Sequence, residues 1–424
     1  MPIGWEQLAS GVALPLDDVD VPLLTEIELP APGGNPVGDV ESAARSAVIA
    51  RLQLSPGTSV AVGASSRGLS GRVEVLRGAI AGLRDLGALP FVVPAMGSHG
   101  GATADGQLAT LARLGITEDA IGAEIRSSME TTVVATAEDD EVGSIRVHLD
   151  RHAAAADVIL PVNRIKPHTQ FHGPAESGLA KMAVVGFGKR SGAADFHATG
   201  PRRMNRRLAA SVAALRATGR LLGGVGTVEA ADGSVVDLQA LTADDVGGPA
   251  ESALLESARA MLPSLPFDEI DVLVIEQGGK DISGTTIDPN VTGRFWIDGL
   301  TDLPRPRVTT IVLLALTPTT AGSALGIGFA DFVPASLAAS IDWEQTYLNC
   351  FTAGPPGIRR GRMPMVLPDE SSCVRAALAT CGRSADEPKR VVRIRSTLHL
   401  TRCWVSDALL AELPGDTRVV NPSS

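Results

Sequence analysis

The chain alternates short apolar runs with longer stretches in which apolar residues recur every three or four positions. The short runs have the length of buried strands and the longer stretches have the period of helices, so the pattern predicts a parallel α/β fold. Residues 58–101 illustrate it, with a strand over TSVAVG, a helix that Gly87 can end, and a second strand over LPFVVP. One face of that helix is predicted to carry Val73, Leu76, Ile80 and Leu83.

The same alternation continues along the chain. Thr103 can N-cap a helix that carries leucines at 108, 111 and 114 and stops at Gly115. Further buried strands are predicted over residues 156–163, 271–277 and 307–316, and each leads into a polar or glycine-rich loop. Because ligands bind beyond the carboxyl ends of strands in open α/β sheets, these loops are the places to search for a site.

The length of 424 residues favours two domains. The segment MLPSLPFDEID, residues 261–271, carries two prolines before a new strand and predicts the boundary between a domain at 1–264 and a domain at 265–424. The net charge of −11 and the 3% aromatic content argue against partners such as nucleic acid or an anionic membrane.

The remaining composition favours a cytoplasmic protein. The first twenty residues lack the basic and apolar regions of a signal peptide, and the longest apolar run, residues 309–316, is too short to span a bilayer. The four cysteines have no CxxC spacing, so we expect buried thiols.

Lysine is rare in this chain and is concentrated in one segment. The chain has 32 arginines and 5 lysines, a bias that fits a GC-rich genome. Residues 163–197 nevertheless hold Lys166, Lys181 and Lys189 together with three histidines, at 168, 172 and 197. A retained lysine indicates that a primary amine is needed, because only lysine can become a neutral nucleophile or form a covalent link.

Two loops after predicted strands carry groups that could bind or react. GASSRGLSGR places Ser65, Ser66 and Arg67 where hydroxyls, a guanidinium and helix amides could hold an anion, although a tight turn explains the pattern equally well. The loop has no G-K-[ST] and is not a Walker A motif. GSHGG presents His99 between glycines, where an imidazole can act as an acid or base.

The lysine-rich segment adds His168 after another strand, and Lys181 at the expected start of a helix, where the helix dipole would lower its pKa. His197 follows without HxH or HExxH spacing, so a zinc site with three protein ligands is poorly supported. In the second half, EQGGKDISGTTIDPNVTGR places Gln277 and Lys280 where they could hold a carboxylate and a hydroxyl.

Taken together, these segments resemble the nickel-pincer nucleotide-dependent lactate racemase family and its 2-hydroxy acid racemase and epimerase relatives. The resemblance covers most of the chain and rests on SSRG, PAMGSHGGATADGQ, NRIKPHTQFHGPAESGLAKM, GKDISGTTIDPNVTGR and LNCFTAGPPGIRRGRMPMVLPD. It implies two α/β domains with parallel-rich sheets, with the active site in the inter-domain cleft. It also implies a nickel-pincer nucleotide, the Ni(II)-pyridinium-3,5-bisthiocarboxylate mononucleotide, as cofactor.

The resemblance also implies residue roles. Lys181 matches the lysine that is joined covalently to the cofactor, and His197 matches the nickel ligand. His99 and His168 match the acid/base pair, and Gln277 and Lys280 match the substrate-binding residues. Ser65, Ser66 and Arg67 match the loop that contacts the nucleotide. The implied partners are a small 2-hydroxy acid or sugar acid and the enzymes that synthesise and insert the cofactor.

The sequence departs from the family pattern at two places. Ala64 stands where the pattern has an aspartate, and the segment from His168 to Lys181 is longer, so a hydroxy acid larger than lactate, or a sugar acid, is expected. Two other functions stay open, namely a Schiff-base lyase that uses Lys181 and a non-catalytic binder of the nucleotide. A nicotinamide dehydrogenase is least supported, because no G-x-G-x-x-G follows a strand. Tyr347, Asn349 and Arg362 match the pattern without an assignable role.

Overall fold

The computed structural model describes residues 4–11, 13–66, 70–198, 200–297 and 300–420. The chain folds into two compact units, one formed by residues 32–262 and the other by residues 1–31 together with 263–424. Both units are α/β, as the apolar pattern predicts. The N-terminal 31 residues belong to the second unit and not to the unit formed by residues 32–262, because β1 (Leu24–Glu28) pairs antiparallel with β14 (His399–Ser406).

The unit of residues 32–262 is built on a five-stranded sheet in the order β3-β2-β6-β7-β8. The first four of these strands run parallel, and β8 is antiparallel to β7. A separate hairpin is formed by β4 and β5. The strands are β2 (Ser59–Ala64), β3 (Leu89–Pro94), β4 (Thr131–Asp139), β5 (Gly143–Asp150), β6 (Val158–Arg164), β7 (Gly223–Glu229) and β8 (Val235–Thr242).

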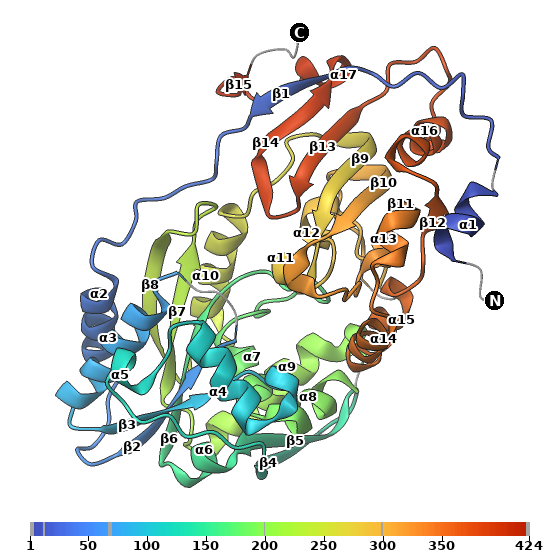
Figure 1. Cartoon of the computed structure of the whole chain (residues 1–424). Helices are drawn as coiled ribbons and strands as arrows, with labels where there is room; N and C mark the ends of the chain where they lie inside the picture. Colours follow the sequence, from blue (N-terminus) through green and yellow to red (C-terminus); the bar gives the residue numbers. More distant parts are fainter. Residues whose placement is uncertain (1–3, 12, 67–69, 199, 298–299, 421–424) are drawn as a thin grey trace. The chain divides into compact units, whose positions relative to one another are not determined.

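Helices cover both faces of this sheet, which is why its strands are apolar on both sides. Val60 and Val62 pack with α2, α3, α4 and α5, whereas Ala61 faces the core formed with the hairpin and α6–α10. Helices α2 and α3 lie side by side (Figure 1). The helices are α2 (Val40–Arg51), α3 (Arg72–Asp85), α4 (Ala104–Arg113), α5 (Glu118–Ile121), α6 (Arg151–Ala155), α7 (Leu179–Lys181), α8 (Lys189–His197), α9 (Met204–Ala217) and α10 (Pro249–Ala260), with the short turns η1 (Gly100–Ala102), η2 (Met182–Gly186) and η3 (Pro201–Arg203).

The second unit is built on an eight-stranded sheet in the order β12-β11-β10-β9-β13-β14-β1-β15. The strands from β12 to β13 are parallel, and the last three are joined to them by antiparallel pairs. Besides β1 and β14, the strands are β9 (Glu269–Gly278), β10 (Arg307–Leu316), β11 (Phe332–Pro334), β12 (Met365–Leu367), β13 (Val391–Ser396) and β15 (Arg418–Val419).

The helices of the second unit complete its two apolar layers. Helix α16 packs its buried side chains against Val272, Val274 and Val312, while α12, α13 and α17 contribute to the core on the other face. The helices are α1 (Trp5–Ser10), α11 (Lys280–Ser283), α12 (Pro289–Thr292), α13 (Ala335–Ala339), α14 (Trp343–Thr352), α15 (Pro355–Arg360), α16 (Glu370–Thr380) and α17 (Asp407–Leu410), with the turns η4 (Pro318–Thr320) and η5 (Ile327–Phe329).

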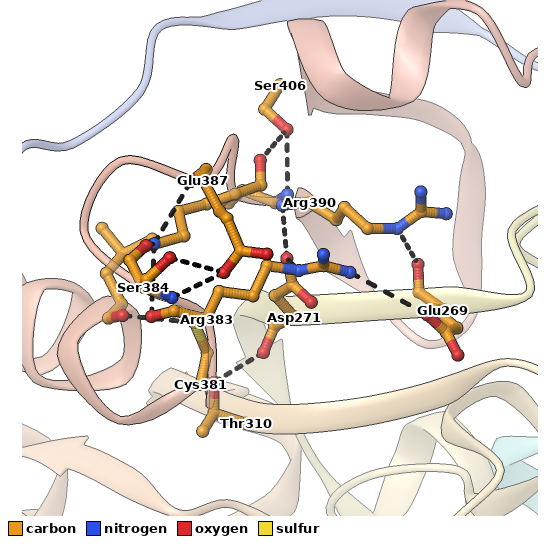
Figure 2. Close-up of polar contacts among 12 residues, drawn as sticks. Glu269, Asp271, Thr310, Cys381, Arg383, Ser384, Glu387, Arg390 and Ser406 are labelled. Atoms are coloured by element: carbon orange, nitrogen blue, oxygen red, sulfur yellow. Dashed lines mark hydrogen bonds and ion pairs between the residues drawn. The ribbon is translucent and has the colours of Figure 1, made fainter.

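A polar cluster fixes the amino end of β9 (Figure 2). The buried carboxylate of Asp271 accepts hydrogen bonds from Arg383 Nε, at 2.6 Å, and from the backbone N–H of Arg390, at 2.7 Å. Thr310 Oγ donates to the Asp271 carbonyl at 2.8 Å. The cluster therefore joins the connection before β13 to two central strands, at the end of the sheet opposite to the one where ligands are expected.

The local predictions hold at the level of single elements. The strands predicted over 156–163, 271–277 and 307–316 correspond to β6, β9 and β10, and Thr103 caps α4 by accepting from Gly106 N–H at 3.1 Å. The four cysteines are buried thiols, and burial raises the pKa of Cys373 and of Cys403 to about 12. Within the described ranges, none of the helices has the length and apolar content needed to cross a bilayer.

Candidate functional site

Three loops of the unit formed by residues 32–262 follow neighbouring strands of one sheet. Strand β2 lies between β3 and β6, and all three run parallel, so the loops that follow them leave the same edge. The chain turns to opposite sides of β2 to reach β3 and β6, which makes this edge a topological switch point. Ser66, His99 and His168 are carried by these loops. Ser65 directly follows β2, and Arg67 lies outside the described residues.

The first two loops contact each other through side chains. Ser66 Oγ lies 2.8 Å from His99 Nδ1. His99 is exposed, with its backbone N–H donating to the Met96 carbonyl at 3.2 Å. The hydroxyl thus orients an imidazole that is exposed at the end of a strand, where a histidine can act as a general acid or base.

The loop after β6 is organised by Glu176, whose carboxylate is fully buried. It accepts hydrogen bonds from the backbone N–H of His168 at 2.6 Å and of Gly173 at 3.0 Å. It also contacts His172 Nδ1 at 3.1 Å and pairs with Arg259 of α10. The carboxylate therefore fixes the backbone at His168 and at Gly173, five residues later in the same loop.

Lys181 and His168 are in direct contact. His168 Nδ1 accepts from the backbone N–H of Gln170 at 3.0 Å, so in the neutral ring the proton sits on Nε2. His168 Nε2 faces Lys181 Nζ within hydrogen-bond distance. The imidazole and the amine are therefore hydrogen-bonding partners, which keeps the end of the Lys181 side chain next to His168.

The backbone around Lys181 is helical but not regular. Lys181 ends α7, and the π-helical turn η2 follows it directly. The N-terminus of α7 is capped by Glu251, which accepts from Leu179 N–H at 2.7 Å, Ala180 N–H at 3.2 Å and Gly247 N–H at 2.7 Å. Burial raises the pKa of Glu251, although these three donors oppose the shift. Single π-turns are frequent at functional sites.

His197 ends α8 and is suited to bind a metal. Burial lowers its pKa from 6.5 to about 4, and a positive charge on Lys181 adds to this effect, so the imidazole is neutral near pH 7. Its Nδ1 is buried and has no hydrogen-bond partner among the described residues. The described chain also holds no group of three or more His, Cys, Asp or Glu side chains placed to bind an ion. His197 therefore fits a metal that receives its other ligands from elsewhere.

An apolar aromatic wall joins these groups. The ring of Phe171 lies 4.5 Å from the ring of His168, 5.8 Å from Lys181 Nζ and 6.3 Å from the ring of Phe196, measured to ring centroids. Phe196 in turn meets His197 edge to face at 5.4 Å. Because Phe171 and Phe196 are buried, the polar groups of this cluster interact in a medium of low dielectric constant, where charge effects are strong.

In the second unit, Gln277 and Lys280 lie at the carboxyl end of β9. Gln277 is the penultimate residue of β9, and Lys280 begins α11. Lys280 Nζ donates to Asn349 Oδ1 at 2.7 Å, and Asn349 Nδ2 donates to Ser323 Oγ at 2.9 Å. Asn349, which matched the family pattern without an assignable role, thus holds the ammonium of Lys280 in place.

Comparison with solved structures identifies the type of fold. The structure of the lactate racemase apoprotein from Thermoanaerobacterium thermosaccharolyticum matches with a TM-score of 0.55 and 12% sequence identity, over 89% of this chain and 99% of that one. The fold is lactate racemase-like. A Thermotoga maritima protein matches with a TM-score of 0.46 and 12% identity, over 66% of this chain and 71% of that one. No protein-family model and no curated protein sequence matches the chain.

The lactate racemase-like fold brings the predicted site residues into three groups. Ser66 and His99 contact each other. His168 and Lys181 lie against Phe171, and His197 meets Phe196, which contacts Phe171. Gln277 and Lys280 share one strand end in the other unit. Sequence reasoning missed Glu251, whose spacing from Lys181 carries no local signal, and left Asn349 without a role.

Proposed function

We propose that this protein is an isomerase that racemises or epimerises a 2-hydroxy acid with a nickel-pincer nucleotide. The observation that carries the proposal is a lysine amine, Lys181, close enough to His197 for its charge to lower the pKa of that buried imidazole, which is neutral near pH 7. Lys181 would be joined to the cofactor, and His197 would bind its nickel. A single protein ligand suffices because this cofactor brings the other three, which agrees with the lack of a larger ligand cluster in the described residues. The lactate racemase-like fold supports the same reading.

The cofactor, when bound, would accept and return the hydrogen on C2 of the substrate. The protein's own groups handle the rest of the reaction. His99 and His168 would take the hydroxyl proton and give it back, one for each enantiomer, because the hydroxyls of the two enantiomers point in different directions. Lys280, held by Asn349, and Gln277 would bind the substrate carboxylate and neutralise the charge on its oxygens. Ser65 and Ser66 would contact the nucleotide.

Intact-protein mass spectrometry with nickel analysis tests this proposal. The protein would be produced together with cofactor-synthesis enzymes, as wild type, Lys181→Ala, His197→Ala and the control Lys389→Ala in the other unit. We expect a covalent adduct with about one nickel per chain in wild type and control, no adduct in Lys181→Ala, and adduct with little nickel in His197→Ala. Unmodified, nickel-free wild type from a host shown to make the cofactor would refute the proposal.

A second measurement, on the cofactor-loaded protein, distinguishes an enzyme from a protein that only stores the cofactor. Racemisation of a panel of 2-hydroxy acids would be followed by chiral chromatography. Inversion of any substrate that disappears in both His99→Ala and His168→Ala supports an enzyme with two acid/base groups. Loaded protein that inverts no hydroxy or sugar acid would indicate a binder of the nucleotide.

The contact between His168 and the Lys181 amine also favours a second candidate, a lyase that forms a Schiff base, because the imidazole could take a proton from the amine. Such an enzyme would leave His197 without a function. Borohydride reduction in the presence of 2-keto acids and aldehydes would give a stable mass increase on Lys181 if this reading is right. An unchanged mass at Lys181 across the panel would exclude it.

A further inference from the structure

Lys189 is buried, charged and unused by the proposed chemistry. It is the third lysine of the segment 163–197, and its side chain is fully inaccessible to solvent. Its Nζ lies 3.2 Å from Asp150 Oδ2, donates to Gln107 Oε1 at 2.8 Å and donates to the Pro94 carbonyl. Burial lowers the pKa of Lys189, and Asp150 opposes this shift. An ammonium taken out of water at such cost needs partners on several sides.

The partners of Lys189 lead directly to the His99 loop. Gln107, on α4 and fully buried, donates from Nε2 to the Gly97 carbonyl at 2.9 Å and to the His99 carbonyl at 3.3 Å. Pro94 is the last residue of β3, from which this loop starts. The Lys189 ammonium thus contacts Pro94, where the loop starts, directly. Through the amide of Gln107 it is also linked to two carbonyl groups within the loop.

Lys189 and the His99 loop are both connected to the segment that carries Lys181 and His197. Lys189 is the first residue of α8, eight positions before His197. Gly97 N–H donates to the Gly186 carbonyl at 3.0 Å, at the end of the π-helical turn that follows Lys181. A Cβ added at Gly186 would lie 2.6 Å from the Ala95 carbonyl oxygen, so only glycine allows this close approach.

We propose that Lys189, acting through Gln107, is a positioning residue that holds the His99 loop in register with the segment carrying Lys181 and His197. The consequence for catalysis rests on the proposed function, whereas the positioning itself does not. Lysine suits this place because its compact ammonium donates to acceptors on β3 and α4 and also forms an ion pair with Asp150 at the end of β5. The planar fork of arginine donates in different directions and is larger, so Lys189→Arg should not restore the arrangement.

Hydrogen exchange on the cofactor-free protein tests the positioning. The variants are Lys189→Met, Gln107→Met, their combination, and Lys189→Met with Asp150→Asn, which leaves no unpaired charge and keeps the cap that Asp150 provides to α6. Gln107→Met leaves the pair of Lys189 and Asp150 intact. We expect amide exchange in residues 96–103 to rise about tenfold or more in each single variant, as follows from losing a hydrogen bond to a charged group. The combined variant should show no further rise, because both changes cut the same link.

The decisive comparison is the variant with both Lys189→Met and Asp150→Asn. If it folds with near-wild-type stability and its loop exchanges as fast as in Gln107→Met, Lys189 positions the loop. If its loop is as protected as in wild type, Lys189 serves only to neutralise Asp150, and the proposal is overturned. Amides of β6 report global stability and should exchange at the same rate in all variants compared.

A kinetic readout on loaded protein separates this inference from the proposed function. Adduct and nickel content should equal those of wild type in Gln107→Met, because this variant leaves Lys181 and His197 in place. The kcat should fall about tenfold or more with KM changed less than twofold, and the dependence of kcat on pH should shift, because a displaced His99 meets different neighbours. Unchanged kcat and pH profile in a Gln107→Met protein with a loosened loop would refute the link to catalysis. Inactive, unloaded wild type would instead refute the proposed function and leave the exchange result standing.

Discussion

Removing the buried carboxylate of Glu176 should release the loop that carries His168. Arg259 provides a matched control, because it pairs with Glu176, whose side chain is 0% exposed, and also with Glu256, whose side chain is 65% exposed. Glu176→Ala and Glu256→Ala therefore each remove one carboxylate that is paired with Arg259. They differ in burial and in the backbone donors that the carboxylate satisfies.

The magnitude follows from the donors left behind. In Glu176→Ala the backbone N–H groups of His168 and Gly173 lose their acceptor inside the protein, which costs roughly 1–3 kcal/mol for each buried donor. Arg259 is one-third exposed, so water replaces part of its lost pairing. We expect a loss of about 3–5 kcal/mol in the free energy that keeps this loop closed. Glu256→Ala should cost less than about 1 kcal/mol.

Hydrogen exchange resolved by peptide provides the assay, since a protein of two units need not unfold in one step. Peptides covering residues 166–177 should exchange faster by a factor of roughly 100 or more in Glu176→Ala, which is the exchange equivalent of 3 kcal/mol. Peptides from the second unit serve as the internal reference. Equal protection of residues 166–177 in the two variants would show that Glu176 does not hold the loop and would refute the reasoning.

Three further predictions concern the other charged groups. Asp271→Ala should lower the free energy of unfolding of the second unit by about 3 kcal/mol in denaturant titrations, because it leaves the Arg390 N–H and Arg383 without their acceptor. The control Asp268→Ala removes a side chain that is 74% exposed in its ion pair with Arg305, and it should change this free energy by less than about 0.5 kcal/mol. The free energy of unfolding of the metal-free protein should fall as the pH falls from 6.5 to 4, because His197 takes up a proton at higher pH in the unfolded chain than in the folded one. His197→Gln should reduce this dependence of the unfolding free energy on pH. An unchanged dependence would contradict the lowered pKa of His197. Asn349→Leu should raise KM for the hydroxy acid about tenfold by removing the acceptor that holds the Lys280 ammonium, and an unchanged KM would exclude that role.

The elements with strong local patterns could be predicted from the sequence. Val60 and Val62 face one side of the sheet and Ala61 the other, so β2 reads as a continuous apolar run, which is typical of a strand covered on both faces. The cap at Thr103 is similarly local. The assignment of β1 to the second unit could not be predicted, because Ile27 pairs with Cys403, and no periodicity in one sequence reports a partner so far along the chain.

The candidate site likewise has residues that could be predicted from the sequence and residues that could not. That reactive groups follow strands β2, β3 and β6 is visible in the sequence, since each loop begins where an apolar run ends. Their supports are not visible. Glu251 caps the helix of Lys181 from a different helix, and Arg259 pairs with Glu176 across a comparable separation, so both contacts exist only after the sheet has formed. Local patterns predict the candidate residues, and the tertiary fold decides which residues hold them.

The three lysines of the segment 163–197 show how one composition bias can have several causes. The scarcity of lysine indicates that an amine is needed where lysine persists, and for Lys181 the proposed function supplies a chemical reason. For Lys189 the reason we propose is geometric, because two acceptors and the Asp150 carboxylate surround a compact ammonium, whereas a guanidinium is larger and donates in other directions. An arginine-rich chain thus has grounds to retain lysine both for proposed chemistry and for positioning. Only the structure distinguishes the two, since both lysines look alike in sequence.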